Sequence, residues 1–327
     1  MKWIITHESA LEFWRKVSAA EIPLSKRIID SKLPDSVEDI VVLLASLPVE
    51  LDKPLHVLIG KNSGRHSTKG LVQHVCTARL PSRSFIQIAP GLAVSSPELC
   101  FAQMANGYGQ VELIKLGYEF CGVYRLDEDQ EYQIDKEGKP ARGFRDDVAL
   151  TSVAKLAAYA AKLNNVKGLA KAKRASRCII DASASPMETI LAMILTLPQL
   201  LGGFGLPKPT LNHRIELSAK AKQVLRRQYF VCDLCWLPIR LVLEYDSDAY
   251  HTETEKIALD AIRRNALEYV GLDVITVSRE QVVNIVELRK IVELISKKLG
   301  RQLRLKPDFM ARHADLRSQL LPSSKNR

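Results

Sequence analysis

The segment 231–246 constrains the fold of this chain more than any other part of the sequence. Two apolar runs flank residues 237–240, which include a proline, and acidic residues interrupt both runs. An apolar run, a short loop and a second apolar run predict a β-hairpin with its loop at 237–240. Counting outward from that loop gives three predicted cross-strand pairs: Trp236 with Leu241, Cys235 with Val242, and Asp233 with Glu244.

The predicted hairpin collects three carboxylates on one face of a sheet. Asp233 and Glu244 are expected to lie opposite each other, with Cβ atoms about 4.5–5.5 Å apart. Asp246 returns to the same face because side chains alternate along a strand. Like charges at this spacing destabilise a sheet unless one is protonated, a basic group pairs with them, or a cation binds. The spacing leaves two interpretations open: a site for Mg²⁺ or Mn²⁺, and an exposed strand end with ordinary acids.

The sequence around the hairpin alternates between helix and strand patterns. Ser185 followed by Pro186 predicts a helix start, because serine is a good N-cap and proline fits the first helical position. That helix is expected to run to about residue 201. Further strands are predicted at 211–217, 228–237, 241–245 and 274–277, and further helices at 255–270 and 280–299. This pattern predicts an α/β fold.

The first half of the chain is less regular. Residues 1 to about 50 have apolar residues at helical spacing, strands are predicted at 55–59 and 85–88, and helices at 96–104 and 148–163. These elements predict a smaller mixed α/β region ahead of the C-terminal domain. We therefore expect three parts: a mixed α/β N-terminal region at 1–178 that ends in a basic linker, an α/β domain at 179–300, and a basic tail at 301–327.

The charge balance favours a polyanionic partner. Lysine and arginine outnumber aspartate and glutamate by 47 to 37, which gives a net charge of +10, and such an excess is a common footprint of nucleic-acid binding. Residues 162–177 contain six basic residues and no acidic one. This run is either an exposed linker or helix face, or a nucleic-acid contact. The candidate contact residues are Lys167, Lys171, Lys173, Arg174, Arg177 and, further along the chain, Arg263.

Cysteine usage and hydropathy predict a cytoplasmic protein with no membrane partner. The six cysteines have no framework spacing, as expected for thiols in a reducing compartment. The longest uncharged run, 189–207, contains Pro198 and three glycines, so its helical part is too short for a bilayer. Cys232 and Cys235 form a CxxC pair, but no second pair accompanies them, and strand residues three apart point to opposite faces. A zinc site is therefore not expected there.

The second half of the chain contains Ser185-Pro186-Met187-Glu188, Asp233, Glu244-Tyr245-Asp246, His251, Asp260, Arg263, Leu267, Gly271 and the predicted strand 274–277. This set of residues resembles a known family, the DUF559 domain. That domain is related to the very-short-patch-repair endonucleases and has the PD-(D/E)XK restriction-endonuclease-like fold, a central mixed sheet flanked by helices. The resemblance covers about residues 180–300, and residues 50–180 more loosely resemble the body of abortive-infection type IV antitoxins.

The resemblance implies a divalent-metal-dependent nuclease that hydrolyses phosphodiester bonds in DNA, with Mg²⁺ or Mn²⁺ as cofactor. It implies that Asp233 and Glu244 are metal ligands and that Asp246 is an added or alternative ligand. Glu188, on the preceding helix, matches an acidic residue that members of this fold aim at the metal. His251 matches a histidine that contacts phosphate or positions water.

The sequence departs from the family in the segment after Glu244, where the family's Asp-Gly is Asp246-Ser247 and an extra residue precedes His251. Asp246 stands where the family has lysine, two residues after the glutamate. An alternative interpretation is therefore an antitoxin-like or regulatory DNA-binding protein with a degenerate nuclease core. A third is a protein-interaction scaffold with no nucleic-acid role. The sequence leaves two protein partners open: a second copy of the chain, or a toxin.

Overall fold

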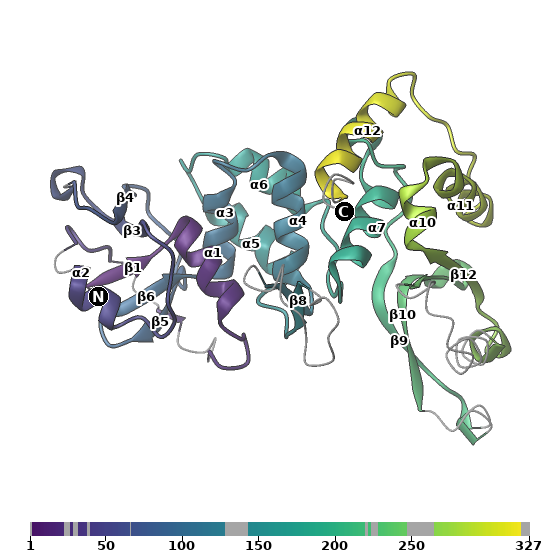
Figure 1. Ribbon diagram of the computed structural model, residues 1–327, viewed down its shortest axis with the longest axis horizontal. Helices are drawn as coiled ribbons and strands as arrows, with labels where there is room; N and C mark the ends of the chain where they lie inside the picture. Colours follow the sequence, from purple (N-terminus) through teal and green to yellow (C-terminus); the bar gives the residue numbers. More distant parts are fainter. Residues whose placement is uncertain are drawn as a thin grey trace. The chain divides into compact units, whose positions relative to one another are not determined.

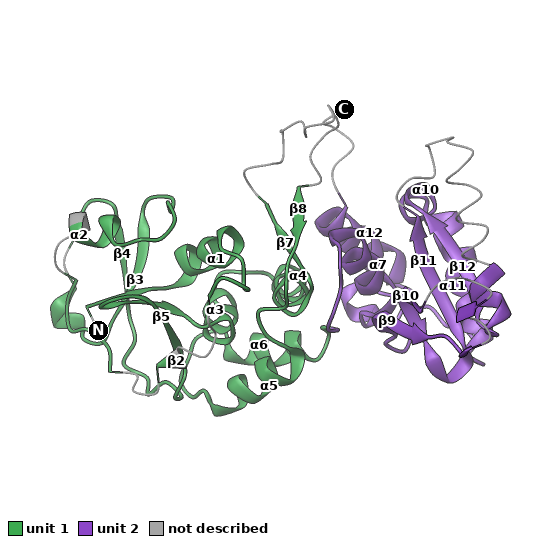
Figure 2. Cartoon of the chain, turned by 90° about the horizontal axis from the view of Figure 1, so that it is seen from below, with its two compact units in different colours: residues 1–179 green, residues 180–327 purple. Residues whose placement is uncertain are grey.

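A computed structural model of the chain divides into two compact units, Met1–Ile179 and Ile180–Arg327 (Figure 2). The division falls next to the predicted boundary between residues 178 and 179. The N-terminal unit, unit 1, is the larger of the two, so the expectation of a smaller N-terminal region is wrong. The structure describes residues 2–22, 27–28, 32–37, 40–65, 67–127, 143–219, 222–223, 228–246 and 265–321.

Unit 1 is built on a six-stranded mixed sheet in the order β2-β5-β6-β1-β3-β4. The strands are β1 (Trp3–Ile5), β2 (Arg27–Ile28), β3 (Leu55–Ile59), β4 (Leu71–Val75), β5 (Phe85–Ala89) and β6 (Leu92–Ser95). The predicted strands at 55–59 and 85–88 are confirmed. The expectation of helix from residue 1 is wrong for β1, which is buried between β6 and β3. Three residues are too few to show a period, and pairing on both sides makes them a strand.

Six α-helices are described in unit 1, and strands of the sheet contact the first and the third of them (Figure 1). They are α1 (His7–Lys16), α2 (Ile40–Ala45), α3 (Pro97–Met104), α4 (Gln110–Cys121), α5 (Val153–Lys162) and α6 (Leu169–Ser176), with the short hairpin β7 (Tyr124–Leu126) and β8 (Phe144–Asp146) after α4. Ile4 and Phe85 of the sheet share one apolar cluster with Leu99 of α3 and Tyr159 of α5. The predicted helix at 148–163 begins later, because the Ser152 side chain caps α5 by accepting a hydrogen bond from a backbone N–H.

Unit 2 contains a four-stranded mixed sheet in the order β12-β11-β10-β9. The strands are β9 (Thr210–Glu216), β10 (Tyr229–Trp236), β11 (Leu241–Asp246) and β12 (Asp273–Ser278). β10 is antiparallel to both of its neighbours, and β12 is parallel to β11. All four predicted strands are confirmed, with each end within one residue of its expected position. The α/β class is therefore confirmed for this unit.

The helices of unit 2 begin at capped positions. They are α7 (Pro186–Thr196), α10 (Arg279–Val283), α11 (Ile285–Lys298) and α12 (Phe309–Leu320), with 3₁₀ turns η3 (Gln199–Leu201) and η4 (Leu237–Ile239). The Ser185 hydroxyl accepts from the Glu188 N–H, as expected of the N-cap of α7. The predicted single helix at 280–299 is two helices, because the Asn284 side chain accepts from the first N–H groups of α11 and so restarts the helix.

The prediction of a basic tail at 301–327 is wrong for residues 309–320. These residues form α12, which packs on α7 and η3. The Phe309 side chain is 1% exposed, and the Phe204 ring lies 5.0 Å from the Phe309 ring and 4.9 Å from the His313 ring. A count of the basic residues after position 300 does not reveal this apolar face. Residues 322–327 lie outside the described part of the chain.

The long uncharged run at 189–207 does not form one helix. α7 ends at Thr196, and the glycine at 202 has a φ of +85° after η3, a left-handed conformation that glycine adopts readily. Among the described residues, no helix combines the length and the apolar character needed to cross a bilayer.

Candidate functional site

The predicted hairpin is present in unit 2, with the expected register. The described pairs between β10 and β11 are Leu234–Leu243, Cys235–Val242 and Trp236–Leu241. The loop is η4 followed by Arg240 in the left-handed region at φ +54°. The Arg240 Nε donates to the carbonyl of Gly271, at 2.7 Å, which ties the loop to the turn before β12. Two of the three predicted cross-strand pairs are therefore confirmed directly.

Asp233 and Glu244 lie one position beyond the last of these pairs. The Asp233 Oδ2 accepts a hydrogen bond from the Tyr245 N–H at 2.7 Å, so the carboxylate of Asp233 reaches across to the backbone of β11. Asp246 follows at the end of β11, where it is paired in register with Ser278 of β12. The three acidic residues are all half-buried. The three acidic residues that the sequence singled out therefore lie at the same end of the β10–β11 pair.

The negative charge at this end of the sheet affects the pKa of the neighbouring Cys235 thiol. Burial, and after it the negative charge of Glu244, raise the pKa of the Cys235 thiol to about 11. Cys235 is opposite Val242, and Val242 shares a strand face with Glu244. The register therefore places Glu244 on the same face of the sheet as Cys235, in agreement with its effect on the thiol pKa. At neutral pH the Cys235 thiol is neutral. Cys232 and Cys235 are both buried in one apolar cluster of unit 2.

Glu188 is held in place at the start of α7 by three donors. Its Oε1 accepts from the Ser185 hydroxyl at 3.0 Å. Its Oε2 accepts from the Ala184 N–H at 2.9 Å and from the Asn212 side-chain amide at 2.6 Å. The pairs on either side of Asn212 in β9 place it opposite Asp233 in β10. Glu188 is therefore linked through Asn212 to the strand position beside Asp233, and sequence reasoning missed Asn212 because no motif marks it.

The donor set at this end fits a hard cation. Carboxylate oxygens are the protein ligands that Mg²⁺ prefers, with water and phosphate oxygens completing its shell. Asp233, Glu244 and Asp246 are the residues that could hold such an ion. Mn²⁺ takes the same ligand types.

The remaining predicted site residues lie elsewhere. His251 and Arg263 lie outside the described residues. The five basic candidates at 167–177 belong to unit 1, on α6 and its flanks, so the run is a helix face rather than a linker. Lys171 is half-buried, and its ammonium donates to the Tyr108 carbonyl at 2.5 Å. Of these five candidates, the exposed ones are Lys167, Lys173, Arg174 and Arg177.

A second group of titratable side chains, which sequence reasoning missed, lies in unit 1. This histidine cluster consists of His7 and Glu8 at the start of α1, His56 on β3 and His74 on β4. The Nε2 of His74 lies 3.1 Å from the Nδ1 of His56, and a Glu8 carboxylate oxygen contacts the same Nδ1. The His7 and His74 rings stack with centroids 3.6 Å apart.

The environment sets the charge states in the histidine cluster. Burial, and then the neighbouring His74, lower the pKa of His7 to about 3. Burial, and then the neighbouring His56, lower the pKa of His74 to about 4. The hydrogen bond with His56 is the main cause that lowers the pKa of Glu8 to about 2. At neutral pH His7 and His74 are therefore neutral imidazoles, and Glu8 is an anion.

Comparisons with known proteins do not identify the chain. No protein-family model matches it, and neither a curated protein nor a solved structure matches it. The resemblance to the DUF559 domain therefore stays a prediction, carried by the residues quoted above.

Proposed function

We propose that unit 2 is a divalent-metal-dependent nuclease of the restriction-endonuclease-like class that hydrolyses phosphodiester bonds in DNA. The observation that carries the proposal is the placement of Asp233, Glu244 and Asp246 at one end of the β10–β11 pair, with Asp233 anchored to the Tyr245 backbone. The mixed sheet with a capped helix ahead of it supports the fold that the resemblance implies.

In this proposal Asp233 and Glu244 hold the metal ion, and Asp246 is an added or alternative ligand. When bound, the ion supplies Lewis-acid chemistry: it polarises a water, clamps the scissile phosphate and neutralises developing charge. The protein anchors one of these proposed ligands and orders a neighbouring strand position. Asp233 is fixed by the Tyr245 N–H, and Glu188 fixes Asn212 on the neighbouring strand. Preorganised ligands cost no reorganisation when the reaction takes place.

The alternative proposal is a DNA-binding protein whose nuclease core is degenerate. One observation favours it: Asp246 replaces the lysine of the family, and a lysine at this position would stabilise negative charge. The two proposals agree on DNA binding and differ on cleavage. The discriminating experiment offers single-stranded, duplex and branched DNA to the full chain with Mg²⁺, with Mn²⁺ and with EDTA. Cleavage that needs the ion supports the nuclease. Binding without cleavage supports the degenerate core, and the absence of both supports a protein-interaction scaffold.

Metal binding is expected to depend on Asp233. A ligand that binds only the folded state raises the melting temperature, with a stabilisation of about 2.7 kcal/mol at a concentration about 100 times Kd. We expect Mg²⁺ or Mn²⁺ to raise the melting temperature of unit 2, and Asp233→Asn to remove this shift while the fold is kept. The asparagine carbonyl oxygen can still accept the Tyr245 N–H, which keeps the local hydrogen bond.

The matched control for this variant is Asp273→Asn. Asp273 is an exposed acid of the same sheet, paired in register with Leu241 at the opposite end of β11, and it forms an exposed ion pair with Lys298. Exposed ion pairs contribute about 0–1 kcal/mol, so the baseline melting temperature should change little. The metal-induced shift should be as large as in the wild type. Calorimetry with and without the ion checks both variants, and a full shift in Asp233→Asn would place the ion elsewhere.

DNA binding is expected to weaken with salt through the exposed face of α6. Each phosphate contact contributes about −0.9 to the slope of log K against log salt for duplex DNA. Replacing Lys173 and Arg174 with alanine is therefore expected to flatten the slope by about 1.8. Fluorescence anisotropy across a salt series measures it. Replacing Arg289 and Lys290 of α11 makes the same charge change at another exposed face, and an equal flattening there would contradict a specific role for α6.

A further inference from the structure

Three side chains of the histidine cluster converge from three different elements of unit 1. Glu8 lies in the first turn of α1, His56 on β3 and His74 on β4. β3 and β4 are parallel neighbours, and the register pairs His74 with Leu58, two residues after His56. The two imidazoles therefore belong to the same face of the sheet. One carboxylate oxygen of Glu8, one ring nitrogen of His56 and one of His74 all lie within 4.8 Å of one another.

Hydrogen bonding alone accounts poorly for this convergence. The Nδ1 of His56 meets both the Glu8 carboxylate and the Nε2 of His74, the latter at 3.1 Å. A ring nitrogen has one in-plane site, which carries either a proton or a lone pair. A proton there forms one linear hydrogen bond, and a lone pair accepts one, so two groups compete for a single site. A cation among the three atoms accepts a lone pair from each of them.

We propose that Glu8, His56 and His74 form a binding site for a zinc-class divalent cation. Two imidazole nitrogens and one carboxylate oxygen are a known ligand set of zinc sites that keep an open fourth position. Imidazole also favours Zn²⁺, Cu²⁺ and Ni²⁺ over the hard ion Mg²⁺. The site lies in unit 1, so it is independent of the carboxylate site proposed in unit 2.

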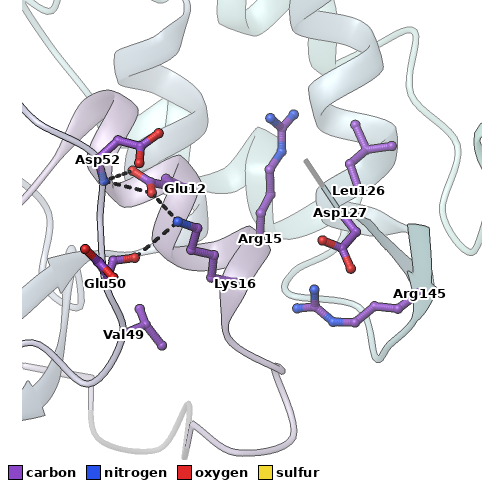
Figure 3. Close-up of a pocket in the computed structure, with 9 residues that line it drawn as sticks. All are labelled: Glu12, Arg15, Lys16, Val49, Glu50, Asp52, Leu126, Asp127 and Arg145. Carbon is purple, nitrogen blue, oxygen red and sulfur yellow. Dashed lines mark hydrogen bonds and ion pairs between the residues drawn. The ribbon is translucent and has the colours of Figure 1, made fainter. Parts of the chain in front are cut away.

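A cavity next to the cluster gives a fourth ligand access to the site. Glu8 and His56 line a cavity of about 310 Å³, whose wall also includes Glu12, Arg15 and Asp52. Three of these residues also line a second cavity of about 520 Å³, shown in Figure 3. The shared wall is ordered by ion pairs and hydrogen bonds, such as the one from the Asp52 N–H to the Glu12 carboxylate at 2.9 Å. Two of the three proposed ligands therefore border a space large enough for a water or a small polar ligand.

His7 packs against one of the proposed ligands, His74. Its ring stacks on His74 with an interplanar angle of 11°, and its Nδ1 lies 3.1 Å from the Thr6 hydroxyl. The Thr6 hydroxyl in turn accepts from Ser95 at 3.1 Å. His7 has a φ of +49°, which residues other than glycine adopt rarely and which is enriched at binding sites. This arrangement fixes the plane of the His74 ring, as an outer shell does around a metal ligand.

The test is zinc titration of the full chain after treatment with EDTA. Isothermal titration calorimetry with ZnSO₄ is expected to give one tight site per chain that Mg²⁺ does not occupy. Losing an outer-shell partner alone lowers metal affinity about 10–100-fold, so we expect His56→Ala and His74→Ala to lower it more than 100-fold. His213→Ala removes a half-buried histidine of β9 in unit 2 and is expected to leave the affinity unchanged. Asp233→Asn should also keep the zinc site, which separates it from the site in unit 2.

Glu8→Gln keeps the test valid if an alanine variant fails to fold, because the Glu8 side chain is 59% exposed. Visible absorption of the Co²⁺-loaded chain reports coordination directly, and we expect its ligand-field bands to change or vanish in Glu8→Gln. The proposal is overturned if the wild type takes up no zinc. It is also overturned if folded variants at Glu8, His56 and His74 bind zinc as the wild type does.

Discussion

Replacing Glu244 with glutamine is expected to lower DNA cleavage by about 10³-fold or more while DNA binding is kept. A carboxylate that holds the metal acts on the transition state, and the metal contributes several kcal/mol of charge stabilisation there. A loss of about 4 kcal/mol corresponds to about 10³-fold in rate. Glutamine has nearly the same shape but lacks the charge, and removing a negative charge beside a phosphate does not weaken binding. Single-turnover cleavage and anisotropy on the same DNA measure the two effects separately.

The matched control for Glu244→Gln is Glu268→Gln. Glu268 is an exposed acid of the same unit, so the change in net charge is the same. Wild-type rates are expected for this control. Equal residual cleavage in wild type and Glu244→Gln would indicate a contaminating nuclease. No cleavage in either, with DNA binding kept, would favour the antitoxin-like or regulatory alternative.

The hairpin and the strands of unit 2 could be predicted because their signals are local. A proline-containing loop between two apolar runs sets the register by counting, and the pairs Cys235–Val242 and Trp236–Leu241 follow from that count alone. The anchoring of Asp233 by the Tyr245 N–H could not be predicted. A side chain that replaces a ladder hydrogen bond leaves no trace in the alternation of apolar and polar residues.

The histidine cluster could not be predicted for a different reason. Its residues are far apart in the sequence, on α1, β3 and β4, and no metal-ligand spacing joins them. The one local signal is a histidine within each of two apolar strands, at His56 and His74. A lone histidine in a strand is usually a packing residue, and only the parallel pairing of β3 with β4 places the two side by side. Long-range topology, which sequence patterns do not contain, creates this site.

The C-terminal helix shows how composition can hide a core element. The residues after 300 are rich in lysine and arginine, which is typical of a solvated tail. In α12, however, Phe309, His313, Leu316 and Leu320 are buried at helical spacing. Only two of the seven lysine and arginine residues after position 300, Arg312 and Arg317, belong to α12. The spacing of the buried residues therefore indicates the helix, and the net charge of the segment does not.

Phe309→Ala is accordingly expected to destabilise unit 2 by about 3–5 kcal/mol, the usual cost of removing a buried aromatic ring. The Phe309 side chain is 1% exposed, and its ring packs 5.0 Å from Phe204 and 5.1 Å from His313. At about 2–4 °C per kcal/mol for a unit of this size, the unit 2 transition should fall by about 10 °C. Calorimetric unfolding of the full chain measures it.

Met310→Ala is the matched control for this variant, since Met310 is the next residue of α12 and is 53% exposed. Truncating an exposed side chain usually changes stability by no more than about 0.5 kcal/mol. Both variants keep the helix, because alanine is the best helix former. A loss confined to Phe309→Ala therefore reports packing of α12 on α7 and η3 rather than helix propensity. Equal small effects in the two variants would mean that α12 does not stabilise the unit, and that the chain after residue 300 behaves in solution as the tail its composition suggests.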